Sequence, residues 1–340
     1  MSGPARLSCA LSVLDLCPVL SGSTAAGAMA DTLALARRVD ELGYTRYWLA
    51  EHHGMGGIAS SSPEIIIGHV AGVTRRIRVG SGGIMLPNHA ALKVAESFLT
   101  LEAFHPGRID LGLGRAPGTG ERTAVALRGS VDAVYEDRFP EQLVELQGFL
   151  GAGFEPGHPF EHVRAMPADG GKPELWMLGS TDYGARFAAE RGMPYAFAQH
   201  FSPLPAEQVL ELYRTLFKPS AALAKPRAIV AISAVCAPTD DEAQDLSMSP
   251  ELAFHLFRQT GISNPLPTVA EARAAEPDPR AWRHIRAARM PRFVGSPVTV
   301  QAALTRLVEG SGADEVMVLT MVHDQAARRR SYELLREMVR

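Results

Sequence analysis

The chain contains few cysteines, and their positions suit neither a disulfide framework nor a zinc site. Only three of the 340 residues are cysteine, namely Cys9, Cys17 and Cys236. An odd number of widely spaced cysteines excludes the small secreted domains that disulfides hold together, because those domains use paired cysteines at high density. We therefore expect a cytoplasmic protein.

Long hydrophobic runs are also missing. A helix that spans a membrane needs about 18 or more consecutive apolar residues, and no stretch of this sequence approaches that length. The apolar stretch that begins at Leu7 is interrupted by Asp15 and Pro18. Its alternation with a period of two is typical of a strand, so we interpret it as a strand and not as a signal peptide.

An excess of charge of either sign is absent. The formal net charge is −3, and charged residues make up 21% of the chain with both signs dispersed. Because nucleic acids and anionic membranes attract basic surfaces, the composition gives no reason to expect either partner.

The common phosphate-binding and nucleophile motifs are missing as well. Residues 112–118 begin with G-x-G, but Pro117 occupies the sixth position, where a dinucleotide-binding loop needs glycine. The sequence contains neither a P-loop nor the G-x-S-x-G elbow of hydrolases. A bound nicotinamide cofactor therefore has no support.

A strand–helix–strand unit over residues 77–118 organises the chain. Residues 77–81 and 109–114 have the β-branched and apolar content of buried strands. Between them, residues 92–104 have apolar side chains at three- and four-residue steps, which is typical of a helix that packs on a sheet. The second strand brings Arg115 and several glycines to its C-terminal end, where a ligand can approach the backbone closely.

The same alternation covers the rest of the chain. Further strands are expected at residues 7–14, 47–50, 174–178, 194–198, 228–235 and 316–320. Helices alternate with them, including a single helix over residues 132–150. About eight such units predict one (β/α)₈ TIM-barrel domain over residues 1–340, because parallel strands need helical crossovers. The alternative is an open doubly wound sheet.

A long insertion interrupts this alternation near the C-terminus. Residues 261–291 are rich in proline and alanine and carry a charged cluster over 280–289. Insertions of this length inside an alternating fold are usually lids or binding segments. We therefore expect a lid before the last strand–helix units.

The active site of such a barrel lies at the C-terminal ends of its strands. His52 and His53 follow the second strand, and they suit either a buried hydrogen-bonding pair or a general base or oxyanion partner. His200 follows the sixth strand. The sequence leaves both interpretations of the histidine pair open.

Two further strand ends suit an anionic ligand. Residues 179–181 follow the fifth strand and suit a helix N-cap, whose free N–H groups also bind phosphate. Arg115 follows the fourth strand and suits either an ion pair with Asp110 or Glu102 or contact with a phosphate or carboxylate. The glycines around Arg115 favour the ligand.

Four segments together resemble the bacterial luciferase-like flavin-dependent monooxygenases, and specifically the group with the alkanal monooxygenases and polyketide-tailoring members. The segments are WLAEHHGMGGIASSSPEIIIGHVAG, RVGSGGIMLPNHAALKVAESFLTLEAFHPGRIDLGLGRAPGTG, LWMLGSTDYGARFAAERGMPYAFAQHF and FVGSPVTVQAALTRLVEGSGADEVMVLTMVHD. They occur in the family's order and cover most of the chain, so the combination is specific.

The resemblance implies a barrel that binds reduced FMN (FMNH₂) at its mouth and uses O₂ to oxidise a small organic substrate through a flavin hydroperoxide. His52 matches the family's catalytic histidine. The residues that would bind the cofactor are Ser81, Gly82 and Gly83 under the flavin ring, often with a non-prolyl cis peptide, and Gly114, Arg115, Gly179, Ser180 and Tyr183 around the phosphate. Many members carry serine or threonine in place of Tyr183.

The resemblance also implies partners. A separate NAD(P)H:flavin reductase would supply the reduced flavin, since the chain lacks a nicotinamide fingerprint. A homodimer would form through the helices at 63–74 and 92–104, which carry little charge. The alternatives are a deazaflavin-dependent oxidoreductase on the same fold and a non-catalytic flavin-binding protein.

Overall fold

A closed barrel of parallel strands forms the centre of the computed structural model, which describes residues 7–275 and 293–339. The strands are β1 (Ala10–Asp15), β2 (Arg46–Leu49), β3 (Arg78–Met85), β4 (Ile109–Gly114), β5 (Glu174–Gly179), β6 (Tyr195–Ala198), β7 (Ala228–Cys236) and β9 (Glu315–Leu319). Each strand pairs with the next in parallel, and β9 closes the sheet by pairing with both β7 and β1. The predicted (β/α)₈ barrel is confirmed, and the closed sheet excludes the open doubly wound alternative.

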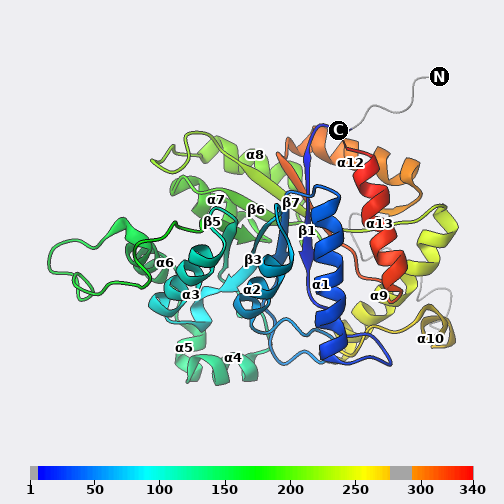
Figure 1. The fold of residues 1–340 in the computed structure, drawn as a ribbon, viewed down its shortest axis with the longest axis horizontal. Coiled ribbons are helices and arrows are strands. Elements are labelled where there is room, and N and C mark those ends of the chain that lie inside the picture. Colours follow the sequence, from blue (N-terminus) through cyan, green and yellow to red (C-terminus); the bar gives the residue numbers. More distant parts are fainter. Residues whose placement is uncertain (1–6, 276–292, 340) are drawn as a thin grey trace.

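Helices surround the barrel (Figure 1). They are α1 (Ala25–Glu41), α2 (Pro63–Val73), α3 (Ala91–Phe104), α4 (Glu121–Arg128), α5 (Val131–Tyr135), α6 (Phe139–Gln147), α7 (Asp182–Glu190), α8 (Ala206–Leu216), α9 (Asp240–Thr260), α10 (Val269–Ala274), α12 (Pro297–Ser311) and α13 (Gln325–Glu337). The sequence sets their ends locally. The side chain of Thr24 caps α1 by accepting from the Gly27 N–H at 3.1 Å, and Gly43 follows the helix with φ of 77°. Over the described ranges, no helix is long and apolar enough to cross a membrane.

The region between β4 and β5 differs from the prediction of one helix over residues 132–150. The structure has α5 and α6 there, separated by extended backbone at Glu136, and a π-helical turn at Gly148–Ala152. An additional helix, α4, precedes them. The prediction of one helix was wrong because Pro140 lacks an N–H and fits only the first turn of a helix, so a new helix begins beside it.

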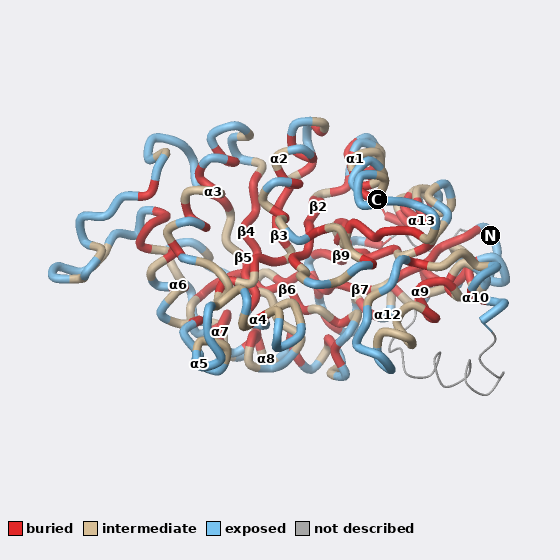
Figure 2. Tube along the Cα trace, turned by 90° about the horizontal axis from the view of Figure 1, so that it is seen from below, coloured by how far each residue is buried: buried red, intermediate tan, exposed pale blue. Residues whose placement is uncertain are grey.

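The lower end of the barrel, at the N-terminal ends of the strands, is filled by a charged network. The Arg46 guanidinium donates to Asp110 at 2.8 Å, to Glu174 at 2.9 Å and to Glu315 at 3.1 Å. Figure 2 shows that the strands themselves are buried along the barrel. Paired charges occupy this end, whereas ligands of such barrels bind at the C-terminal ends of the strands.

The middle layer of the barrel is apolar. The rings of Trp48 and Trp176 meet edge to face, with centroids 5.6 Å apart. The other buried members of this layer are Leu14, Ala50, Ala196, Ile229, Ala231, Met317 and Leu319. Because these side chains fill the interior, the barrel is a packed core and not a channel.

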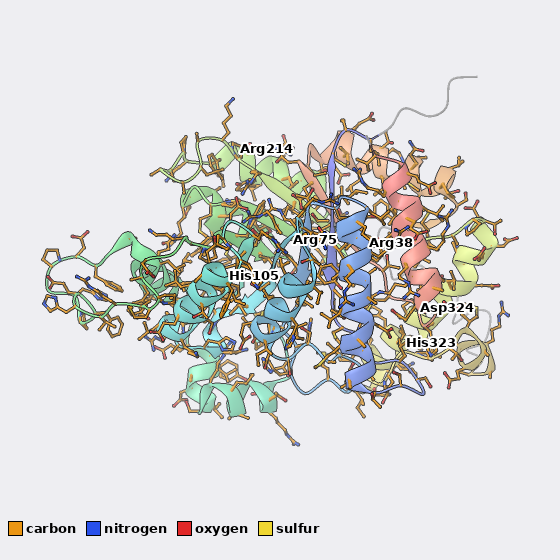
Figure 3. The ribbon with its side chains drawn as sticks, in the orientation of Figure 1. Arg38, Arg75, His105, Arg214, His323 and Asp324 are labelled. Carbon is orange, nitrogen blue, oxygen red and sulfur yellow. The ribbon has the colours of Figure 1, made fainter. Side chains whose placement is uncertain are left out.

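The described part of the predicted lid, residues 261–275, lies over the loops that follow β1 and β2. The Leu266 N–H donates to the Val19 carbonyl at 2.7 Å, and the Ser21 N–H donates to the Leu266 carbonyl at 2.8 Å. Nε2 of His323, beside Asp324 at the start of α13 (Figure 3), lies 3.1 Å from the carbonyl oxygen of Ser21. The remainder of the predicted segment, 276–291, falls outside the described residues.

Candidate active site

The upper end of the barrel brings the predicted strand-end residues into two groups. A histidine group follows β2, and an arginine group follows β4 and β5. The glycines at the end of β3 lie between them, because β3 pairs with both β2 and β4. The two groups have different chemistry and are described in turn.

His52 is half-buried and has one free ring nitrogen. Its backbone N–H donates to the Ser60 carbonyl at 3.0 Å, but Nδ1 is buried without a hydrogen-bond partner among the described residues. Burial lowers the pKa of His52 below its ordinary value, against the opposing charge of Glu51. The lowered pKa favours the neutral imidazole at pH 7, and its Nδ1 is unpartnered.

His53 is held in place by a hydrogen bond to a buried carboxylate. Its Nε2 lies 2.8 Å from Glu51 Oε1, and its carbonyl accepts from the Thr119 hydroxyl at 2.7 Å. The two histidines thus differ: the His53 ring is hydrogen-bonded, whereas His52 Nδ1 has no partner among the described residues.

Glu51 organises this side of the mouth, although the sequence argument did not include it among the site residues. Its side chain is fully buried, and it accepts from the Met85 N–H at 2.9 Å and lies 2.9 Å from His89 Nε2. Burial alone raises the pKa of the Glu51 carboxyl, but the hydrogen bond and charge of His89 and the hydrogen bonds of His53 and the Met85 N–H outweigh it, so the pKa lies below its ordinary value. The sequence signal that could have identified Glu51 as a site residue is its position directly before two histidines.

His89→Gln should destabilise the protein most in mildly acidic solution. Burial lowers the pKa of His89, but the hydrogen bond and charge of Glu51 outweigh burial and raise it. The raised pKa of His89 contributes stability that is fully present below about pH 6.5 and is lost as the pH rises through the pKa of the folded state. The lowered pKa of Glu51 contributes stability that is present above about pH 4.5. The stability difference from wild type should therefore be largest near pH 5.5.

Urea unfolding at pH 5.5, 7 and 9 measures this difference. His162→Gln, at an exposed position, is the control and should show little effect at any pH. A destabilisation by His89→Gln that is equal at all three pH values would contradict the ion pair with Glu51.

Two consecutive residues in the second half of β3, Gly82 and Gly83, have no side chains. A cis peptide bond joins Gly82 and Gly83, as the resemblance implied. A Cβ atom on Gly83 would lie 2.7 Å from the Gly112 carbonyl oxygen, and one on Gly82 would lie 3.0 Å from Leu14. Ser81 is fully buried and donates its hydroxyl to the Gly112 carbonyl at 2.9 Å, so only its backbone is left for a ligand.

Arg115 and Tyr183 meet at the other side of the mouth. The guanidinium carbon of Arg115 lies 3.9 Å from the centre of the Tyr183 ring, and Nη1 pairs with Asp137 at 3.1 Å. The sequence suggested Asp110 or Glu102 as the ion-pair partner of Arg115, but the partner in the structure is Asp137. Arg115 is about half exposed, so its charge is accessible to an anion.

The start of α7 lies beside this arginine. Thr181 is the N-cap residue, but its side chain makes no capping hydrogen bond. Gly179 allows the first turn to approach the strand, because a Cβ atom there would lie 3.2 Å from the Gly184 Cα. The Ser180 carbonyl accepts from the Ser202 hydroxyl at 2.6 Å. The first turn of α7 therefore has backbone N–H groups free to bind an anion near Arg115.

His200 places a second neutral imidazole at the mouth. Its Nδ1 lies 3.2 Å from the Ala231 carbonyl, and this contact requires Nδ1 to be the protonated nitrogen. Burial lowers the pKa of His200 to about 4, helped by the charge of His52 and opposed by the bond to Ala231. Sequence reasoning placed His200 at a strand end without a role.

Comparison with known proteins shows similarity over nearly the whole chain. Residues 11–315 match the family described as luciferase-like monooxygenase. A luciferase-like monooxygenase of Escherichia coli (strain K12) is 42% identical, covering 96% of this chain and 95% of that protein. The N-acetyl-S-alkylcysteine monooxygenase of Bacillus subtilis (strain 168) is 32% identical, covering 97% and 98%. The crystal structure of apo-MsnO8 is 38% identical with a TM-score of 0.87, covering 97% and 98%.

Proposed function

The chain belongs to the luciferase-like monooxygenase family, and we propose that it is a monooxygenase that uses reduced FMN and O₂ to oxidise a small organic molecule. The observation that carries this proposal is the free Nδ1 of His52 at the end of β2. β2 is the direct neighbour of β3, in which Gly82 and Gly83 carry no side chains. This arrangement suits a planar ligand with a proton-transfer group beside it.

Both ends of the mouth fit FMN. Arg115 and the uncapped first turn of α7 suit its phosphate, since guanidinium groups and helix N-termini bind phosphate oxygens. Tyr183 and Ser180 lie beside these proposed phosphate-binding groups. Gly114 and Gly179 are the last residues of β4 and β5 and carry no side chains. We place the flavin ring beside Gly82 and Gly83, two consecutive residues that offer backbone and no side chains.

The residues of the chain hold the reactants and move a proton. Bound reduced FMN supplies the electrons for the reaction with O₂. His52 is neutral and has a free nitrogen, so it is able to accept or donate a proton at the substrate or at oxygen. His53 is unsuited to this role because Glu51 holds its ring.

A separate NAD(P)H:flavin reductase supplies the reduced flavin in this proposal. The sequence contains no nicotinamide-binding fingerprint. The purified chain should therefore not oxidise NADH or NADPH in the presence of FMN and O₂, and adding a flavin reductase should start flavin turnover. We place the enzyme in the cytoplasm, since Cys9, Cys17 and Cys236 are all free thiols.

Anaerobic titration tests the choice of cofactor. Reduced FMN should bind more tightly than a reduced deazaflavin, and admission of O₂ should then oxidise the bound flavin. A deazaflavin-dependent reductase would show the opposite preference and little reaction with O₂. A non-catalytic flavin-binding protein would bind FMN but oxidise none of the aldehydes, sulfonates, thioethers or aromatic compounds in a substrate screen.

Arg115→Ala should weaken binding of reduced FMN by about 1.5–3 kcal/mol, because a charge-assisted contact with the phosphate is lost. Riboflavin lacks the phosphate and should bind the variant nearly as well as it binds the wild type. Asp137→Asn offers a second check, since it releases Arg115 from its ion pair and should leave FMN binding intact or tighter. Equal losses for FMN and riboflavin in the Arg115 variant would place the phosphate elsewhere.

We propose that the enzyme is a homodimer through α2 and α3. These helices lie side by side on one face (Figures 1 and 2), and they expose Ile65 by 61% and Phe104 by 76%. Large apolar side chains left open on adjacent helices mark interaction surfaces. The double variant Ile65→Asp/Phe104→Asp should halve the mass measured by sedimentation at micromolar concentration. Val298→Asp, which is 74% exposed on α12, should not change it.

A further inference from the structure

His200 has a fixed orientation at the mouth of the barrel, and the chemistry proposed above does not use it. Its backbone N–H donates to the Ala231 carbonyl at 3.0 Å, and its Nδ1 lies 3.2 Å from the same oxygen. The Phe201 ring meets the imidazole edge to face, with centroids 4.6 Å apart. These contacts hold the ring by its Nδ1 side and leave Nε2 for a further partner.

The Ala231 carbonyl determines which ring nitrogen of His200 carries the proton. A carbonyl oxygen only accepts hydrogen bonds, so Nδ1 donates, and in the neutral imidazole Nε2 is then an acceptor. Because burial lowers the pKa of His200 to about 4, the neutral form is the one present at pH 7. Nε2 bonds to no described residue and is not enclosed by protein. His200 therefore presents an open, fixed acceptor.

His200 lies across the mouth from His52. In the closed sheet, three strands separate β2 from β6 in either direction, namely β3, β4 and β5 on one side and β1, β9 and β7 on the other. The residues that follow β2 and β6 are therefore on opposite sides of the mouth. The charge of His52 helps to lower the pKa of His200, which agrees with two imidazoles that lie near each other.

Apolar side chains form the floor between the two histidines. Leu16 follows β1, Leu178 lies near the end of β5, and Met321 follows β9. All three are partly exposed and pack on the apolar layer inside the barrel. Leu178 also adjoins the place assigned to the flavin, since a Cβ atom on Gly83 would lie 3.2 Å from it. A ligand between the histidines would therefore meet mainly apolar surface and one fixed acceptor.

We propose that His200 is a specificity-determining residue, which selects an apolar substrate with an O–H or N–H group by accepting a hydrogen bond from that group at Nε2. This inference rests on the proposed monooxygenase function, because it places the substrate between His200 and His52. The bond would hold the donor end of the substrate on the β6 side of the mouth. A substrate without a donor would leave Nε2 unpaired and bind more weakly.

Two isomeric probes test the acceptor. 4-Ethylphenol and 4-methylanisole have the same molecular formula and similar shapes, but only the phenol carries an O–H group. The full chain would be titrated with each probe by calorimetry, in the presence of oxidised FMN. The wild type should bind the phenol about two- to tenfold more tightly than the ether, because only the phenol donates to Nε2.

Two variants separate the acceptor of His200 from its anchor. His200→Asn is able to donate to the Ala231 carbonyl but has no acceptor at the position of Nε2, so the preference for the phenol should disappear. The side-chain oxygen of His200→Gln reaches that position, so this variant should keep the preference. FMN should bind both variants as it binds the wild type, because the proposed flavin contacts lie elsewhere. His162→Asn, at an exposed position, is the control and should keep the preference.

Nitrogen-15 NMR of the chain labelled at histidine measures the tautomer independently of affinity. The signals of His200 are those that His200→Asn lacks. At pH 7 they should show a protonated Nδ1 and an unprotonated Nε2. The phenol should shift the Nε2 signal, and the ether should leave it in place.

Several results would overturn the proposal. A protonated Nε2, equal binding of the two probes by the wild type, or a preference that persists in His200→Asn would each contradict the acceptor role. A loss of FMN affinity in His200→Asn as large as the loss of phenol affinity would show that His200 contacts the flavin. A wild-type chain that binds no FMN would instead contradict the proposed function, and the same titrations without FMN would then still test the acceptor.

Discussion

His52→Ala should lower the yield of oxidised product per flavin consumed by about 10²- to 10⁴-fold, which is the usual contribution of a positioned acid–base group. Reduced FMN should bind the variant with nearly wild-type affinity, because the proposed phosphate contacts lie across the mouth at Arg115 and α7. Flavin oxidation should continue, and hydrogen peroxide should replace product. The measurement is product and peroxide formed per flavin oxidised, with a substrate found by screening.

His53→Ala is the matched control for this experiment. His53 is the neighbouring residue, but its ring is bonded to Glu51 at 2.8 Å, whereas His52 Nδ1 has no partner among the described residues. We expect the control to lose stability and to keep most of its product yield. A wild-type division between product and peroxide in His52→Ala would show that the proposed proton transfer does not use His52. If only His53→Ala lost the yield, the neighbour would be the catalytic member.

Arg328→Met should lower the free energy of unfolding by about 3–5 kcal/mol, because it leaves a buried carboxylate without its cation. Arg328 and Asp15 are both almost fully buried, and their side chains meet at 2.6 Å. The same arginine donates to the Thr320 carbonyl at 3.0 Å. Asp15 would keep its bonds from Thr32 and Tyr47, but these are neutral donors. Urea unfolding at pH 7 measures the loss.

An exposed ion pair on the same helix provides the comparison. Arg330 lies 3.1 Å from Glu333 with its side chain about half exposed, so Arg330→Met should cost no more than about 1 kcal/mol. The double variant Asp15→Asn/Arg328→Met should recover part of the loss, since neither charge then remains buried. Equal losses in Arg328→Met and Arg330→Met would mean that burial of the pair contributes nothing.

Periodicity and turn residues were sufficient to predict the barrel, because each strand–helix unit is specified by local sequence. The strand over 109–114 was predicted with the bounds that β4 has, and Gly43 ends the first helix as expected. The helix predicted over 132–150 was wrong because apolar periodicity continued across the break before Pro140. Closure of the sheet, which excludes the open alternative, depends on pairing between β9 and β1, a contact that periodicity does not reveal.

The site was predictable only as a set of strand ends. Position alone placed His52, Arg115 and Ser180 at the mouth, and the structure brings Arg115 onto Tyr183. Partners distant in sequence could not be predicted, because side-chain contacts depend on the assembled loops. Glu51 meets His89 only after the chain has passed through α2 and β3. The pairing of Arg115 with Asp137 likewise depends on the break between α5 and α6.

Rapid mixing of the anaerobic complex with O₂ tests the central claim, that the mouth of this barrel binds reduced FMN for reaction with oxygen. The complex of the chain with reduced FMN would be mixed with buffer containing O₂, and absorbance spectra would be recorded from milliseconds to minutes. We expect a transient spectrum that differs from both reduced and oxidised FMN and that decays faster when a substrate is present. Direct conversion to oxidised FMN at the rate of free flavin, without such a transient, would contradict the account.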